Sequence, residues 1–154
     1  MVNPPIRRQW AGFTLLELTI VIILVGLLAS IAVPAYKRYV TTAYVHRAIA
    51  DIGSIALDLK RWELATLRYP DTLAEAGLGG RLDPWGNEYR YLNLEGANIG
   101  AARKDRNLVP INTNFDLYSV GADGNTQTPL VTPASRDDII LANDGSFIGL
   151  AEDY

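Results

Sequence analysis

The sequence contains no cysteine and a single histidine, His46. Without cysteine the chain can form no disulfide, and zinc sites of Cys–His spacing and cysteine nucleophiles are excluded. No Gly-rich phosphate-binding loop occurs. Ser30 lies within an apolar run and Ser54 shares a helical face with few acidic residues, so neither suits a catalytic triad. The composition therefore disfavours an enzyme, and we expect His46 to be a surface or packing residue.

Charge is unevenly distributed along the chain. Residues 1–12 carry Arg7 and Arg8 and no acidic residue, and no charged residue occurs between Leu18 and Tyr36. The chain has 14 basic and 17 acidic residues, so removal of residues 1–12 would make the remainder more acidic. An acidic domain does not suit nucleic acid, and it favours divalent cations or basic partner surfaces.

The uncharged run and the residues just before it predict a membrane helix with one buried acid. The run corresponds to about 28 Å of helix, close to the hydrocarbon thickness of a bilayer. A carboxylate at that depth costs about 2.5–3.5 kcal/mol, so Glu17 requires a cationic partner. The small pair Ala11-Gly12 precedes the apolar run, whereas a secretory signal carries its small residues after it. Cleavage after Gly12 would create an α-amine on Phe13, within reach of Glu17 in the same or an adjacent chain.

The segment Gly12-Phe13-Thr14-Leu15-Leu16-Glu17, followed by the apolar run and Pro34, resembles the class III signal of type IV pilins and type II secretion pseudopilins. The resemblance implies that a prepilin peptidase cuts after Gly12 and methylates the amine of Phe13. It also implies that Glu17 pairs with the amine of a neighbouring subunit during assembly. Residues 1–12 would be the removed leader, 13–36 the transmembrane and assembly helix, and 37–154 a periplasmic domain.

One long helix is expected from about residue 13 to residue 67, membrane-embedded in its first half and amphipathic in its second. Pro34 cannot donate to the carbonyl of Ser30 and should kink or loosen the preceding turn. Gly26 is a second weak point, costing about 1 kcal/mol relative to alanine. By the family resemblance the segment Gly26–Pro34 would lose helicity in assembled filaments. For Gly26, simple tolerance of glycine in a membrane helix is the alternative.

The remainder predicts a small antiparallel sheet. Alternation and turn residues place strands at about 88–92, 114–120 and 138–141, with a short edge strand at 147–150. A helical turn is expected at 73–76, and 93–112, which contains the basic stretch Arg103–Arg106, is expected to be an exposed loop. The fold class is therefore α+β, a long N-terminal helix packed on a small antiparallel sheet, as in type IV pilins.

Two further segments narrow the resemblance to the major pseudopilins of type II secretion: Asp83-Pro84-Trp85-Gly86-Asn87 and Asp116–Gly124. In those proteins the C-terminal loop folds around Ca²⁺, a cation that takes six to eight oxygen ligands. The resemblance implies Asp123, Asp137 and Asp138 as side-chain ligands, with Ser119 and the Val120 carbonyl nearby. An EF-hand is excluded, since a loop starting at Asp123 would carry threonine and alanine where glycine and glutamate are needed. The alternative is an Asp-Gly turn and an acidic strand cap.

The resemblance as a whole implies a structural subunit of a type II secretion pseudopilus, polymerised through its N-terminal helix to help drive protein export. Its partners would be other copies of itself in a helical filament, the prepilin peptidase, minor pseudopilins, an inner-membrane assembly platform and the membrane. It would cross the inner membrane once, with its C-terminal domain in the periplasm, and then enter a periplasm-spanning filament. Three alternatives remain: a type IV pilin used for motility, adhesion or DNA uptake, a minor pseudopilin, and a membrane-tethered sensor that never polymerises.

Overall fold

A computed structural model describes residues 12–97 and 99–154. Most of the leader predicted at 1–12 therefore lies outside the described residues. The chain divides into two compact units, Met1–Val40 and Thr41–Tyr154. The boundary predicted after Tyr36 marks a membrane edge and stays a prediction.

Helix α1 runs from Leu15 to Thr66, 52 residues without a break. It begins two residues later and ends one residue earlier than predicted. Pro34 lies inside it, so the missing proline donor does not interrupt the helix. Gly26 is also helical, and a Cβ there would meet no atom within 4 Å. Loss of helicity between Gly26 and Pro34 concerns an assembled filament and stays a prediction.

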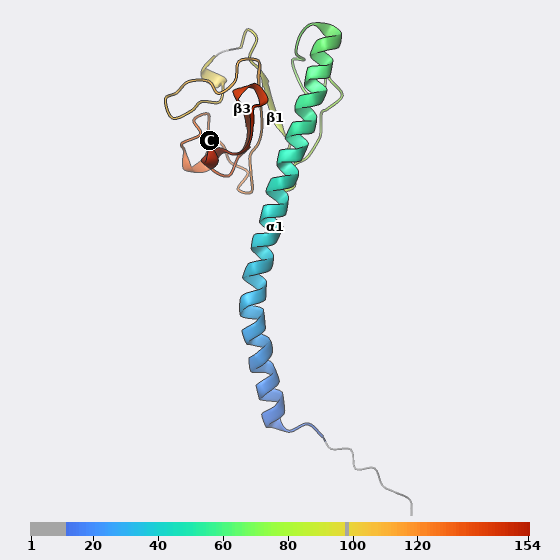
Figure 1. Ribbon diagram of the computed structural model, residues 1–154, viewed down its shortest axis with the longest axis vertical. Helices are drawn as coiled ribbons and strands as arrows, with labels where there is room; N and C mark the ends of the chain where they lie inside the picture. The colour runs from blue at the N-terminus through green and yellow to red at the C-terminus, as the bar shows by residue number, and fades with distance from the viewer. Residues whose placement is uncertain (1–11, 98) are drawn as a thin grey trace, which may run out of the picture. The chain divides into compact units, whose positions relative to one another are not determined.

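The second unit contains a four-stranded antiparallel sheet whose strands are paired in sequence order, β1-β2-β3-β4 (Figure 1). The strands are β1 Arg90–Asn93, β2 Phe115–Ser119, β3 Ile139–Ala142 and β4 Phe147–Leu150. Each lies within two residues of a predicted strand. Short 3₁₀ turns occupy Ile99–Ala101, Pro133–Ser135, Asn143–Gly145 and Ala151–Asp153. Residues 73–76 form hydrogen-bonded turns in place of the predicted helical turn.

Two apolar clusters cover the two faces of the sheet. On one face, Ile52, Ile55 and Leu59 of α1 belong to a core with Ile139 and Leu141 of β3. All five side chains are at most 2% exposed. This arrangement confirms the predicted α+β fold, in which the helix contributes an apolar stripe and the sheet an apolar face.

The opposite face of the sheet is covered by loops. Ile140 and Ala142 of β3 pack there with Ile111, Leu130 and Ala151. Since β3 is buried on both faces, its four residues are all apolar. The prediction that 93–112 is an exposed loop is wrong at its buried residues, Ala102, Arg103, Ile111 and Asn112, although residues 106–109 are exposed. A sheet with two apolar faces needs a second cover, and this loop supplies part of it.

Candidate functional sites at the helix start and the C-terminal loop

The first turn of α1 is closed by a reciprocal pair of side chains. The Thr14 backbone N–H and hydroxyl both donate to Oε2 of Glu17, each at 2.8 Å, and the Glu17 N–H donates to the Thr14 hydroxyl at 3.2 Å. This is a capping box, which satisfies donors that a helix N-terminus otherwise leaves free. Glu17 therefore has a local structural role in addition to the predicted intersubunit role. The T-x-x-E spacing in the sequence could have revealed it.

The predicted cleavage site lies just before this cap. Gly12 and Phe13 precede α1 in non-helical backbone, and Phe13 is 88% exposed. A peptidase could therefore reach the Gly12–Phe13 bond without unwinding the helix.

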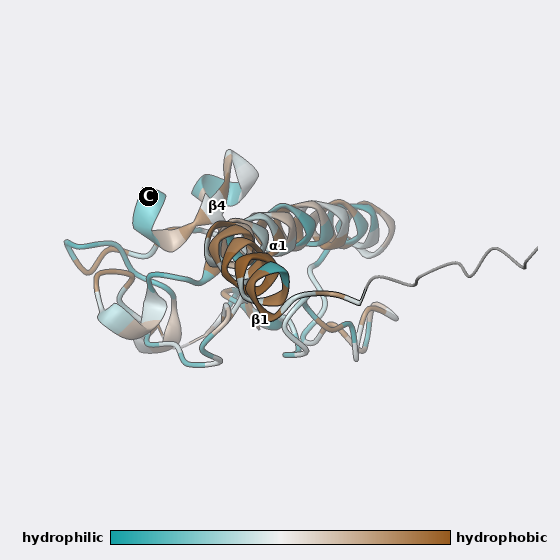
Figure 2. Ribbon diagram, turned by 90° about the horizontal axis from the view of Figure 1, so that it is seen from below, coloured by the Kyte–Doolittle hydropathy of each residue, from teal (hydrophilic) through white to brown (hydrophobic). Residues whose placement is uncertain are grey.

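The N-terminal part of α1 presents apolar side chains on all sides. Its apolar stretch has a mean hydropathy of 2.7 and none of that stretch is buried. The hydrophobic colouring of this part of the helix is visible in Figure 2. A helix that is apolar all round must be covered by lipid or by other helices. The segment therefore fits a single-pass membrane anchor.

Asp83 of the predicted turn holds two distant segments together. Its Oδ1 accepts the backbone N–H groups of Trp85 at 3.0 Å and Asn87 at 2.8 Å. Its Oδ2 accepts the hydroxyl of Ser119, at the end of β2. The Asn87 side chain donates to the Gly121 carbonyl at 3.2 Å. The turn motif is thus the anchor of the loop that follows β2.

The residues predicted to bind Ca²⁺ occupy this loop and its return, and one side-chain oxygen of each of Ser119, Asp123, Asp137 and Asp138 takes part in hydrogen bonds. The Ser119 hydroxyl donates to Asp83 and is fully buried. Oδ2 of Asp137 accepts the backbone N–H groups of Ala122 at 2.9 Å and Asp123 at 3.1 Å. Asp123 in turn caps its own turn, accepting the Asn125 N–H at 2.7 Å.

Asp138 is fully buried and forms an ion pair with Arg103. Its Oδ2 also accepts the Thr126 hydroxyl at 2.6 Å. Burial raises the pKa of the Asp138 carboxyl to about 6, against the opposing effects of Thr126 and Arg103. Val120, whose backbone carbonyl was also predicted to lie near the cation, is buried.

Among the described residues, no group of three or more acidic or histidine side chains is placed to hold a metal ion. Binding of Ca²⁺ itself stays a prediction. Arg103 was missed as a partner of Asp138, because nothing local in the sequence indicates a contact across 35 residues.

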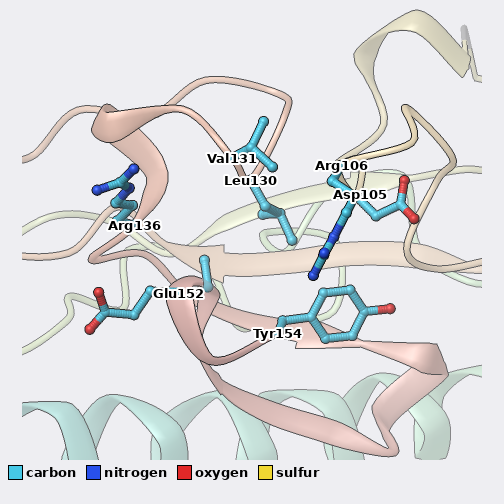
Figure 3. A pocket seen from close by; sticks show the side chains of 8 residues that line it. Asp105, Arg106, Leu130, Val131, Arg136, Glu152 and Tyr154 are labelled. Carbon is cyan, nitrogen blue, oxygen red and sulfur yellow. The ribbon is translucent and has the colours of Figure 1, made fainter.

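A surface pocket of about 650 Å³ lies between two loops and the C-terminal residues (Figure 3). Arg136 and Glu152 lie on one side of it, and Asp105, Arg106 and Tyr154 on the other. Its eight lining residues include no histidine, serine or cysteine. His46 is exposed on α1, as expected of a surface residue. The ionisable residues of the lining are two acids, two arginines and one tyrosine.

Comparison with known proteins agrees with this description. The chain is 33% identical over 141 residues to the type II secretion system core protein G of Pseudomonas aeruginosa, covering 77% of this chain and 87% of that protein. It is 32% identical to the protein of the same name from Dickeya chrysanthemi, covering 91% of each chain. A fimbrial protein of Neisseria meningitidis is 28% identical, covering 86% of this chain and 79% of its own length.

No protein-family model and no solved structure matches the chain. Identity above 30% over most of both chains, a long N-terminal apolar helix and a small antiparallel sheet all agree. The chain therefore belongs to the family of type II secretion system core protein G, the major pseudopilins.

Proposed function

We propose that this chain is the structural subunit of a type II secretion pseudopilus and polymerises through its N-terminal helix to help drive protein export. The observation that carries the proposal is the combination of a fully exposed apolar helix with a single carboxylate in its first turn. The relatives named for type II secretion support it.

Processing comes first. A prepilin peptidase cuts after Gly12 and methylates the new amine of Phe13. Two features support this step: the bond lies in non-helical backbone, and the residues on both sides of it are exposed. The subunit then resides in the inner membrane, crosses it once and places its C-terminal domain in the periplasm.

Assembly follows from the need to cover the apolar helix. In the bilayer, lipid covers it; in a filament, the same surface packs against the helices of other copies. Glu17 pairs with the Phe13 amine of a neighbour and sets the register between subunits. Minor pseudopilins and an inner-membrane platform would start and drive this polymer, which spans the periplasm.

A type IV pilin is the second candidate, supported by the similarity to a fimbrial protein. That similarity is lower than the similarity to the secretion proteins over a comparable share of the chain. Loss of the gene would separate the two functions: a pseudopilin mutant fails to export folded proteins, whereas a pilin mutant loses surface fibres while export continues.

Substitutions in the capping box test the register role, because they separate charge from helix capping. Glu17→Gln keeps a side chain that can still accept at the cap, whereas Glu17→Ala removes both capping and charge. Thr14→Ala weakens the cap and leaves the carboxylate. An amine left unpaired at membrane depth costs about 2.5–3.5 kcal/mol, roughly a hundredfold in the equilibrium constant of each subunit contact.

We expect the native protein and both Glu17 variants to resist carbonate extraction from membranes, but the two variants to yield no filaments in sheared fractions. Thr14→Ala should still assemble. Normal filament yield from Glu17→Gln would refute the register role and leave Glu17 as a helix cap alone. A mature protein that still begins at Met1 would refute the processing step.

A further inference from the structure

Arg103 is a cation enclosed by the C-terminal part of the fold. It is 3% exposed, and its guanidinium pairs with Asp138. The same group donates to the Gln127 carbonyl at 2.7 Å and lies 4.4 Å above the ring of Tyr118. It also donates to the hydroxyl of Thr126. These contacts tie together three segments that are remote in sequence: the loop after β1, the loop after β2, and the start of β3.

Hydrogen bonds also fix the backbone of the loop at Arg103. Its N–H donates to Oδ2 of the buried Asp116 at 2.6 Å. Oδ1 of Asp116 accepts the Asn112 side-chain amide at 3.0 Å, and that amide also donates to the Leu141 carbonyl at 2.8 Å. These hydrogen bonds fix the loop that carries Arg103 to β2 and β3, and they therefore hold the guanidinium in place beside Asp138.

Arg103 already supplies a counter-charge to Asp138. Oδ2 of Asp138 accepts from both Arg103 and Thr126, whereas Oδ1 is buried and accepts no hydrogen bond among the described residues. The guanidinium would also repel a second cation at the same carboxylate. One oxygen of Asp137 and one of Asp123 accept backbone N–H groups of the turn. The fully buried carboxylate of the predicted donor set, Asp138, therefore already has its counter-charge within the chain.

We propose that Arg103 replaces the cation: a guanidinium built into the chain closes the C-terminal loop against the sheet, and closure needs no Ca²⁺. The loop after β1 carries Arg103 and thereby places this positive charge beside the Asp138 carboxylate. This closure involves contacts within the folded subunit alone and does not depend on polymerisation.

The first test uses the unmodified full-length protein in detergent micelles, with the thermal unfolding midpoint followed by tryptophan fluorescence. We expect the same midpoint in excess EGTA and in millimolar CaCl₂. A ligand present at a hundred times its Kd would raise the midpoint by roughly 10 °C, well above the error of the measurement. A saturable rise with Ca²⁺, reversed by EGTA, would overturn the proposal.

The second test removes the guanidinium. Arg103→Met keeps most of the side-chain bulk but leaves Asp138 buried without a counter-charge, so the midpoint should fall by roughly 10 °C or more. Arg106→Met is the matched control, because Arg106 belongs to the same loop and is exposed. Its midpoint should match that of the native protein. An Arg103→Met midpoint equal to that of the control would overturn the proposal.

A double variant separates charge compensation from packing. Asp138→Asn removes the charge that Arg103→Met leaves unpaired, so the double variant should melt above the Arg103→Met single variant. If Arg103 acted only by packing on Tyr118, the second substitution would bring no recovery. Absence of recovery would therefore count against an ionic closure.

Discussion

Asp83 offers a direct test of what the Asp-Pro-Trp-Gly-Asn turn contributes to this fold. The side chain is 5% exposed, and its two oxygens accept three hydrogen bonds, from Trp85, Asn87 and Ser119. Asp83→Ala leaves all three donors without this acceptor. Hydrogen bonds to charged groups contribute about 1.5–3 kcal/mol each, but the Ser119 hydroxyl can rotate and water can enter at the half-buried turn.

We therefore expect a loss of about 3 kcal/mol in the free energy of unfolding. For a domain of this size that corresponds to a fall of about 12 °C in the melting midpoint. The midpoint is measured by tryptophan fluorescence on the full-length protein in detergent. Trp85 lies within the turn itself, so its emission should also report the local change.

Two comparisons make the result interpretable. Asp153→Ala removes an exposed acid near the C-terminus and should change the midpoint by little. Asp83→Asn keeps one oxygen acceptor for the turn and should fall between the native protein and Asp83→Ala. If Asp83→Ala melted within about 2 °C of the Asp153→Ala control, the turn would not be the anchor that the hydrogen bonds indicate.

Three further substitutions probe the core, the loop and the acid response. Ile55→Ala removes a fully buried side chain and should cost about 2–5 kcal/mol, measured as a lower urea midpoint. Gly121→Ala should lower the melting midpoint, since its φ is +67° and a Cβ would lie 2.4 Å from the Asp137 carbonyl oxygen. Partial burial opposes the charge of Asp144, but hydrogen bonds from Thr113 outweigh it and lower the pKa of that carboxyl. The stabilisation that this carboxylate contributes is fully present above the pKa of an unfolded aspartate, and it is lost as the pH falls through the lower folded pKa. Asp144→Asn lacks this carboxylate, so its free energy of unfolding should fall less on acidification than that of the native protein.

Each of these has an outcome that would contradict it. Leu57, 58% exposed on α1, is the control for Ile55, and equal losses from the two alanine variants would refute the packing argument. An unchanged midpoint for Gly121→Ala would mean that the loop can move away from Asp137. Identical acid unfolding curves for the native protein and Asp144→Asn would remove the role given to that carboxyl.

The parts of the fold that could be predicted depend on local patterns. The apolar run after Glu17 identifies α1, since its length and lack of charge have no other common explanation. Alternation next to a strong turn places β1, because a pleated strand with one buried face leaves a period of two in the sequence. β3 is instead a short run of apolar residues, as expected of a strand buried on both faces. The anchor at Asp83 also belongs to a recognisable turn.

The parts that could not be predicted depend on contacts between distant segments. Arg103 is part of a basic stretch, which as a local pattern indicates solvent exposure, yet Asp138 and Thr126 take it into the interior. The acidic residues Asp123 and Asp137 were expected to bind a cation, because a sequence shows which oxygens are present. It does not show that one oxygen of each carboxylate accepts a backbone N–H group of the same turn.

The capping box has a consequence for how a subunit could join a polymer. Both bonds from Thr14 end on Oε2 of Glu17, and within the described residues Oε1 accepts none. An ammonium group arriving from outside can therefore dock on the vacant oxygen while the first turn stays wound. Incorporation would then require no unwinding of the first turn of α1, so that the helix cap and the contact with the neighbouring subunit could exist together.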